Sequence, residues 1–566
     1  MKIGEKILNK SPWGIASGAE WFSDYPKFYP LLKNAGCNWF RYFPEWNTIQ
    51  PEKGKWDWKI ADEFVLYSQK NDMNLVGVWA YFAKWASLDG GTRRGPIKDI
   101  LYWRDYISAT VKRYGNYIKY WEVWNEFNGS FYESDNKVKD YVELVENAYE
   151  EAKRIDPSIK IGLSVASCDI GFLDLVIKNG ASGHFDFIAV HPYENLAAMM
   201  NGDEEGFLQI ARKLRKMLED NKQRKDIQLF ITEIGYQTSI EKDLVQDSKQ
   251  AEAIVKAFLL SIIQGFDRIF WFEARGPAYG HDTDHGIIRR DWSLRPSYEA
   301  LKQMTTLLGN DPEYLGFYNM APELFAFLFN GANHQKIMVL WTECGKKLDC
   351  IFTANVKITK VNSETETVSI GEKVILTESP VFIQQIPEHI IRNVRIDRDN
   401  YFLSEVLRTK KGFFTWHFSR EKINVIRQIF LRDEHKNFVK SCLFDGEFCT
   451  HITDKDRDNI CIYFRIDIDS DFLSHDEGIL RLTLVIKNGM SSEQQSIALT
   501  YETINGYEGF RTGYLAQRLL SESKWHEYSW ELREAYFANR WGWNFALISL
   551  ANSTDFFIRE IKLEKI

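Results

Sequence analysis

Short apolar runs alternate with longer amphipathic stretches over the first three hundred residues of the chain. Eight of these runs are five to seven residues long, which suits buried strands. They cover residues 12–16, 37–43, 74–80, 118–124, 159–165, 185–191, 227–233 and 268–272. Between them, apolar side chains recur at helical spacing, most clearly over residues 140–155, 248–264 and 296–308. Eight strand–helix units in succession predict a (β/α)8 TIM barrel, an α/β fold.

An open, doubly wound sheet is the alternative fold for a chain that alternates in this way. That fold often carries a G-x-G-x-x-G turn directly after its first strand. The residues that follow the first run here are Ser17, Gly18, Ala19 and Glu20, and they do not form this turn. The sequence therefore favours the closed barrel.

The pattern changes after Gly309, where helical periodicity gives way to short strands. Residues 311–390 predict a small β-sandwich packed on the barrel. Residues 391–566 predict a second β-sandwich or jelly roll, resembling a carbohydrate-binding module. We therefore expect three domains, with the catalytic barrel in residues 1–310.

Charge and composition narrow the class of protein. The chain of 566 residues has a formal net charge of −8, and both signs are spread along it, which argues against a nucleic-acid partner. No apolar stretch reaches the roughly 20 residues that span a bilayer, so we expect no membrane partner.

Seven cysteines without a CxxC pair argue against a zinc ribbon and favour a reduced, cytoplasmic setting. The protein would instead be secreted or periplasmic if a leader has been removed. Local disulfides between Cys344 and Cys350, or between Cys442 and Cys449, stay open.

Aromatic residues are abundant, at 15% of the chain. Such residues either fill large cores or line a site that stacks on flat ligands, such as sugar rings or bases. Composition alone does not decide between these two interpretations.

Active sites of (β/α)8 barrels lie at the carboxyl ends of the strands, so the residues that end each run are the candidates for chemistry. Glu126 follows the fourth run and Glu233 ends the seventh. Strands four and seven lie on opposite sides of an eight-stranded ring, so these carboxyl groups can face each other. Two facing carboxyl groups are what glycoside hydrolysis requires. Taken singly, each glutamate would more often be a structural cap or ion-pair residue at the end of its strand, and it is their joint position that favours catalysis.

Further polar and aromatic residues at these ends are candidates for binding a substrate. They are Arg41, Trp79, Asn125, His191, Tyr193, Tyr236, Trp271 and Glu273. Each also has a structural interpretation: Arg41 as an ion-pair partner, His191 as a core residue, the aromatic residues as packing, and Glu273 as a partner of Arg275.

The segment 45–54, Glu-Trp-Asn-Thr-Ile-Gln-Pro-Glu-Lys-Gly, together with Asn125-Glu126 and Glu233, resembles clan A of the retaining glycoside hydrolases. Within that clan the chain is most similar to family 39 over residues 11–390, with family 5 and family 42 as alternatives. The resemblance implies that Glu126 is the general acid/base and Glu233 the nucleophile.

By the same resemblance, Asn125 binds the sugar 2-hydroxyl and Arg41 lies beside the nucleophile. His191 and Tyr193 match the clan's position at strand six, and Trp271 matches the aromatic floor of the subsite at strand eight.

These features predict a retaining glycosidase that acts on a poly- or oligosaccharide without a cofactor or a metal ion. A carbohydrate-binding protein without activity and a transglycosylase are the alternatives.

Arg93, Arg94 and Arg275 leave an anionic glycan open as the substrate. The loop over residues 281–285, His-Asp-Thr-Asp-His, suits binding of substrate hydroxyls better than a metal ion. In residues 391–566, the candidate stacking residues are Trp416, Tyr507, Trp525, Trp541 and Trp543.

Overall fold

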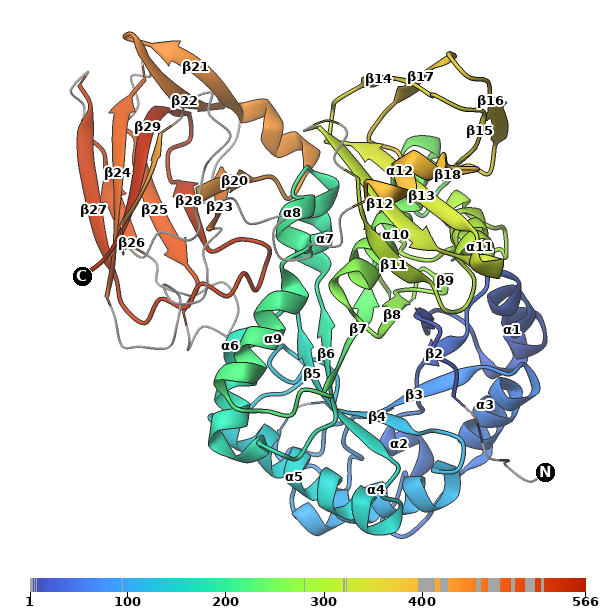
Figure 1. Cartoon of the computed structure of the whole chain (residues 1–566). Helices are drawn as coiled ribbons and strands as arrows, with labels where there is room; N and C mark the ends of the chain where they lie inside the picture. Colours follow the sequence, from blue (N-terminus) through green and yellow to red (C-terminus); the bar gives the residue numbers. More distant parts are fainter. Residues whose placement is uncertain are drawn as a thin grey trace. The chain divides into compact units, whose positions relative to one another are not determined.

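A computed structural model of the chain forms a closed barrel followed by several antiparallel sheets (Figure 1). The structure describes every residue except 1–3, 5, 7, 94, 279, 319, 320, 322, 395–412, 418–425, 455–459, 467–478, 490–493, 504–514 and 521–523. The chain divides into two compact units. The first comprises Met1–Ala166, Leu175–Leu196 and Leu218–Arg398, and the second comprises Ser167–Asp174, Ala197–Met217 and Asp399–Ile566.

Eight parallel strands close the barrel in sequence order, because β1 pairs with both β2 and β8. The strands are β1 (Trp13–Ala16), β2 (Trp39–Arg41), β3 (Asn74–Trp79), β4 (Tyr120–Val123), β5 (Lys160–Ala166), β6 (Phe187–His191), β7 (Gln228–Ile234) and β8 (Arg268–Trp271). Most of their residues are buried, as expected for strands covered on both faces. The predicted (β/α)8 barrel is therefore confirmed, and each predicted run contains its strand or overlaps nearly all of it.

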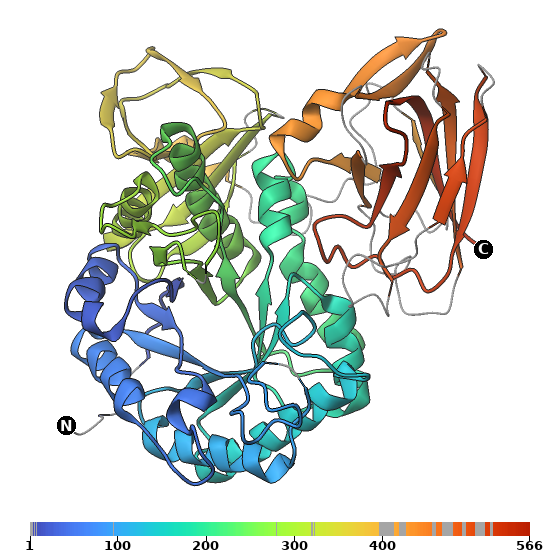
Figure 2. The same cartoon turned by 180° about the vertical axis from the view of Figure 1, so that it is seen from behind.

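Helices follow the strands, and those of the first unit lie outside the ring, as the blue and cyan helices show from behind (Figure 2). In chain order the helices are α1 (Tyr25–Asn34), α2 (Trp46–Ile49), α3 (Lys59–Lys70), α4 (Ile100–Tyr114), α5 (Lys137–Ile155), α6 (Ile170–Val176), α7 (Tyr193–Met200), α8 (Glu204–Phe207), α9 (Ile210–Asp220), α10 (Leu244–Gln264) and α11 (Pro296–Leu308). Of these, α6 to α9 belong wholly or partly to the second unit.

Capping side chains explain why two helices begin earlier than their apolar pattern predicts. The Asn136 side chain accepts a hydrogen bond from the Lys139 amide at the start of α5. The Asp243 side chain accepts from the amides of Val245 and Gln246 at the start of α10. Such caps satisfy amide groups that have no partner within the helix.

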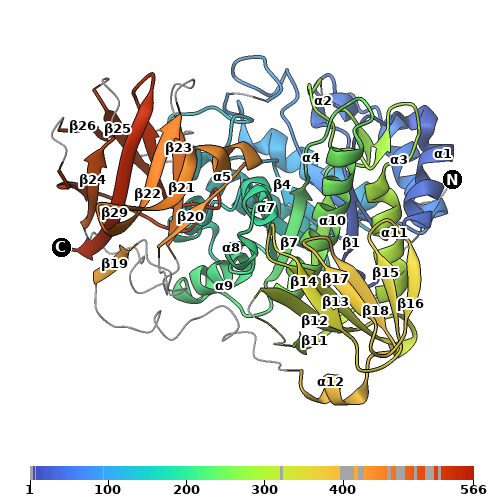
Figure 3. The ribbon, with the colours of Figure 1, turned by 90° about the horizontal axis from the view of Figure 1, so that it is seen from above.

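The first unit continues beyond α11 into a six-stranded sheet beside α10 and α11 (Figure 3). In sheet order its strands are β11 (Glu313–Phe317), β12 (Leu324–Asn330), β13 (Lys336–Thr342), β18 (Val381–Gln384), β15 (Val356–Lys360) and β16 (Thr365–Val368). A separate pair, β14 (Leu348–Ile351) and β17 (Lys373–Leu376), precedes the short helix α12 (Glu388–Arg392). The Lys256 ammonium of α10 lies 5.6 Å from the Trp341 ring of β13, so this sheet packs on the barrel helices.

Two antiparallel sheets form most of the second unit. The larger contains β21 (Val439–Phe444), β22 (Glu447–Asp454), β29 (Thr554–Lys565), β24 (Leu480–Asn488) and β27 (His526–Leu532), with β19 (Phe413–His417) also paired to β29. The other contains β20 (Ile426–Ile429), β23 (Cys461–Ile466), β28 (Phe545–Ser549), β25 (Ser496–Tyr501) and β26 (Leu515–Arg518). One apolar core includes side chains of both sheets, which is the packing of a β-sandwich.

The candidate stacking residues of this sandwich lie in different environments. Trp543 is buried, whereas Trp525 and Trp541 are half-buried, with the Arg559 and Arg540 guanidinium groups over their rings. Tyr507 lies outside the described residues. Glycan binding by this unit stays a prediction.

Two further observations concern expectations from the sequence. No disulfide joins Cys344 to Cys350 or Cys442 to Cys449, so neither proposed local disulfide is present. Among the described residues, no helix combines the length and the apolarity that crossing a membrane requires.

Candidate active site

Glu126 and Glu233 meet at the carboxyl ends of β4 and β7. One carboxylate oxygen of each residue and one ring nitrogen of His191 all lie within 4.8 Å of one another. Both glutamates are mostly buried but keep some exposed side-chain surface, 19% for Glu126 and 14% for Glu233. The predicted facing pair is therefore present as geometry, and a ligand can reach both carboxyl groups.

The backbone that carries Glu126 is strained. Trp124 and Glu126 have φ values of 65° and 49°, in the left-handed region that side chains with a Cβ disfavour. Such conformations persist where the surroundings over-determine them, which is common at functional sites.

Two donors hold the Glu233 carboxylate. Arg41 Nη1 lies 2.6 Å from Glu233 Oε1, and the Tyr193 hydroxyl donates to Glu233 Oε2 at 2.9 Å. Burial by itself raises the pKa of Glu233, but the positive charges of His191 and Arg41 and these hydrogen bonds outweigh it, and the pKa falls below its ordinary value. Glu233 is thus kept ionised, as a nucleophile requires.

Arg41 is itself fixed by residues of β4 and of the loop that follows it. Its Nε donates to Oε1 of the fully buried Glu122 at 2.9 Å, and its Nη2 donates to Glu122 Oε2 at 2.9 Å. Arg41 Nη2 also donates to Asn125 Oδ1 at 2.9 Å. Sequence reasoning missed Glu122, although its place in the same strand as Asn125 and Glu126 was a usable signal.

His191 contacts the other glutamate. Its Nδ1 lies 2.7 Å from Glu126 Oε1, and its Nε2 lies 3.0 Å from Thr232 Oγ1. Burial lowers the pKa of His191, but the charge of Glu233 and the hydrogen bond with Glu126 more than compensate and raise it. Glu126 therefore shares a hydrogen bond with a group that readily holds a proton.

Asn125 is held from both ends of its amide. Besides accepting from Arg41, it donates from Nδ2 to the Tyr81 hydroxyl at 3.1 Å. The Arg93 guanidinium lies 4.8 Å from the centre of the Tyr81 ring and forms an ion pair with Glu45. Arg93 therefore lies close to the site, but its charge is already paired; Arg94 lies outside the described residues.

Two tryptophans predicted to bind substrate are placed differently by the structure. Trp79 has no exposed surface, stacks on Trp121 at 4.8 Å and donates from its indole to Thr110. Trp271 is equally buried and donates to the His285 carbonyl. A fully buried ring cannot stack on a sugar, so both predictions are corrected to core packing.

Phe272 is the half-exposed aromatic residue at the end of β8, and sequence reasoning missed it. Its ring packs edge-on against Tyr193, at 6.3 Å between centroids. Successive side chains of a strand point in different directions, so an error of one residue changes which ring faces the ligand.

Glu273 is also buried, and its Oε1 accepts from the Ala278 amide. Burial raises its pKa to about 9. With no exposed surface it cannot contact a sugar, so its predicted role as a substrate ligand is corrected. The alternative partner, Arg275, forms an ion pair with Asp24. Tyr236 is half-buried after β7, and its substrate-binding role stays a prediction.

Within the part of the chain that the structure describes, one group of side chains could supply ligands to a metal ion. It consists of Glu126, His191 and Glu233. Arg41 already places a positive charge 2.6 Å from Glu233, which opposes binding of a second cation there. The arrangement is better suited to acid–base and nucleophilic chemistry.

An eight-stranded parallel barrel with two facing carboxyl groups at the carboxyl ends of its strands is the arrangement that glycoside hydrolases use. Residues 92–272 match the sequence pattern of glycosyl hydrolases family 39, and this segment contains both Glu126 and Glu233. The chain is a glycoside hydrolase whose residues 92–272 are similar to family 39, and its substrate is a carbohydrate.

Two solved structures match this chain, and the first of them shares its fold. A family 39 glycoside hydrolase from the gut symbiont Bacteroides cellulosilyticus WH2 is 21% identical, with a TM-score of 0.57 over 67% of this chain and 82% of that one. A monomeric β-xylosidase from Caulobacter crescentus CB15 is 14% identical, with a TM-score of 0.48 over 68% of this chain and 98% of that one.

Proposed function

We propose that this chain is a retaining glycosidase that cleaves a poly- or oligosaccharide by double displacement. The observation that carries the proposal is that oxygens of Glu126 and Glu233 lie within 4.8 Å of each other. Retaining enzymes keep their carboxyl groups about 5–5.5 Å apart, whereas inverting enzymes need about 6.5–9.5 Å to admit a water molecule.

In the first step, a Glu233 oxygen attacks the anomeric carbon while Glu126 gives its proton to the departing glycosidic oxygen. The carbon–oxygen bond to the leaving group breaks, and a glycosyl ester on Glu233 forms. Arg41 and Tyr193 support this step because they hold Glu233 ionised and oriented.

In the second step, Glu126 takes a proton from water, and the water oxygen displaces Glu233 from the anomeric carbon. His191 supports both steps because it hydrogen bonds with the Glu126 carboxyl group, which gives the proton in the first step and takes one in the second. Asn125 is proposed to bind the sugar 2-hydroxyl through the amide hydrogen that Tyr81 does not accept.

We further propose that the substrate is neutral rather than anionic. The candidate cations Arg93 and Arg275 are already paired with Glu45 and Asp24, so neither offers an uncompensated charge to a uronate or a sulfate.

A screen of neutral, uronate-rich and sulfated glycans, followed by ¹H NMR of the first product, tests this function. We expect cleavage of a neutral glycan and initial release of the anomer with retained configuration. Initial release of the opposite anomer would contradict the two-step mechanism. Binding without cleavage would favour the non-catalytic alternative, and transfer to added sugar acceptors in preference to water would favour a transglycosylase.

A further inference from the structure

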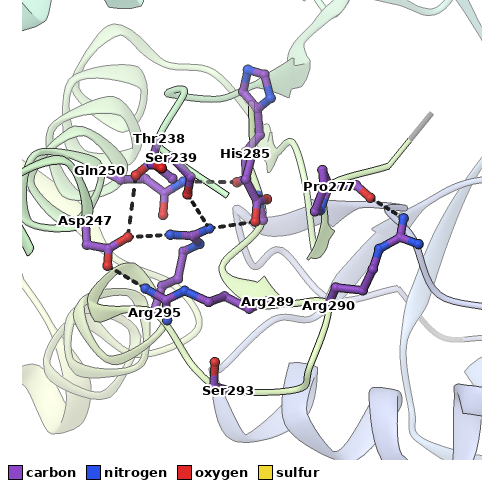
Figure 4. Close-up of polar contacts among 12 residues, drawn as sticks. Thr238, Ser239, Asp247, Gln250, Pro277, His285, Arg289, Arg290, Ser293 and Arg295 are labelled. Carbon is purple, nitrogen blue, oxygen red and sulfur yellow. Dashed lines mark hydrogen bonds and ion pairs between the residues drawn. The ribbon is translucent and has the colours of Figure 1, made fainter. Parts of the chain in front are cut away.

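The loop between β8 and α11 is fixed by a buried ion-pair cluster around Arg295 (Figure 4). Arg295 Nη2 lies 2.6 Å from Asp284 Oδ2, and Arg295 Nη1 pairs with Asp247 of α10. Arg289 forms a second ion pair with Asp247. Because Arg295, Asp247 and Asp284 are almost completely buried, this part of the loop has a defined conformation.

The same loop holds the backbone of His285, the residue after Asp284. Its carbonyl oxygen accepts from Gln250 Nε2 at 3.2 Å, from Trp271 Nε1 at 3.2 Å and from the Glu273 amide at 3.3 Å. Three donors on one carbonyl restrict the main chain, so the direction of the His285 side chain is set by the fold.

The His285 imidazole points away from the Arg295 cluster (Figure 4) and packs against residues of the candidate active site. Its ring centroid lies 5.7 Å from that of Phe272 and 6.1 Å from that of Tyr193, with edge-on geometry in both cases. Tyr193 is the residue whose hydroxyl donates to Glu233. His285 therefore belongs to the wall of the site, beside the nucleophile.

The hydrogen-bonding capacity of this imidazole is not used within the described residues. His285 is 7% exposed, and its Nδ1 is buried without a hydrogen-bond partner among them. Burial lowers its pKa to about 4, so the ring is neutral at ordinary pH and has one N–H donor and one acceptor. Because a buried polar atom without a partner is costly, its presence in the wall of the site points to a role beyond packing.

We propose that His285 is a substrate-contacting residue that hydrogen bonds a hydroxyl of the neutral sugar bound beside Glu233. This assignment rests on the proposed function. A sugar hydroxyl can donate and accept at once, which matches a neutral imidazole, and the Phe272 ring beside it offers an apolar face to the sugar carbons. A sugar carboxylate would meet no positive charge on His285.

The experiment compares the wild type with His285→Phe, His285→Gln and the control His334→Ala, which removes an exposed histidine from the turn between β12 and β13. The probes are 4-nitrophenyl glycosides of neutral sugars, and then the monodeoxy analogues of the glycoside that the wild type cleaves fastest. Thermal melting checks that each variant is folded.

We expect His285→Phe to lower kcat/KM by about 10- to 100-fold, the range expected when a buried hydrogen bond to substrate is lost. We expect His285→Gln to recover part of this loss and His334→Ala to stay near the wild type. One monodeoxy analogue should be poor for the wild type but should lose little further activity with His285→Phe.

A folded His285→Phe enzyme that discriminates against every deoxy analogue as strongly as the wild type would overturn the proposal. If His285→Phe does not fold, the deoxy series is measured on His285→Gln, and unchanged discrimination again overturns it. A wild type without activity on any glycan would instead overturn the proposed function itself, so the two failures are distinguishable.

Discussion

Two buried arginines of the first unit each bind two carboxylates. Arg41 pairs with Glu122 and Glu233, and Arg295 pairs with Asp247 and Asp284. The carboxylates around Arg295 are almost completely buried, at 0% and 1% exposed side-chain surface. Around Arg41, Glu122 is buried as well, but Glu233 keeps 14%.

The difference shows that a buried ion-pair cluster does not by itself mark an active site. Both clusters offset the cost of burying charge with several short hydrogen bonds. Only the Arg41 cluster leaves one carboxylate partly exposed and next to a second carboxylate. We infer that the Arg41 cluster serves the reaction and the Arg295 cluster serves the shape of a loop.

The largest expected effect on activity comes from Glu233→Gln. It keeps the size of the side chain but removes the nucleophilic carboxylate, so we expect kcat to fall by about 10⁴-fold or more. Initial-rate assays on a cleaved glycan measure this, with the exposed Glu52→Gln as the matched control. Activity within tenfold of the wild type would reject Glu233 as the nucleophile.

The largest expected effect on stability comes from Arg295→Met. It leaves Asp284 without its guanidinium partner and weakens the pairing of Asp247, so the free energy of unfolding should fall by about 3–5 kcal/mol. Urea denaturation followed by fluorescence measures the change. If stability were unchanged while kcat collapsed, the two arginines would not have the distinct roles assigned here.

Arg41→Lys tests the other side of the comparison. One ammonium cannot bind both oxygens of Glu122 and also reach Glu233, so we expect kcat/KM to fall by about 10²- to 10³-fold. The same assay on Arg295→Lys should show a much smaller change in the folded enzyme. Equal losses of activity in the two variants would contradict the distinction between a catalytic role for Arg41 and a structural role for Arg295.

Tyr193→Phe should have the smallest effect. The Tyr193 hydroxyl favours the ionised form of Glu233, so its loss raises the Glu233 pKa. At a given acidic pH a smaller fraction of Glu233 is then ionised, and the acid limb of the kcat/KM profile moves to higher pH, by about one unit or less. A limb that moves to lower pH would contradict the role of Tyr193.

The barrel and the positions of the two glutamates could be predicted from the sequence, because both follow from local patterns of apolar residues. Buried parallel strands are short apolar runs, and a barrel places its chemistry at their ends. Glu126 and Glu233 could therefore be located by counting strands.

Side-chain direction and long-range pairing were not accessible in this way. Trp271 and Phe272 are adjacent aromatic residues, and no local pattern tells which of them is buried. The pairing of Arg295 with Asp247 joins residues 48 positions apart, and it is this contact that fixes the loop carrying His285. Such contacts depend on how helices and loops pack, so they appear only in the folded chain.

Arg41 and Tyr193 make Glu233 the nucleophile, and the hydrogen bond with His191 suits Glu126 to act as the acid/base. The most direct test uses a 2-deoxy-2-fluoro glycoside of the preferred sugar with a good leaving group, which slows hydrolysis of the glycosyl ester. Mass spectrometry of the digested protein then locates the label. Our account predicts a single sugar on the peptide that contains Glu233, and a label on Glu126 instead would contradict it.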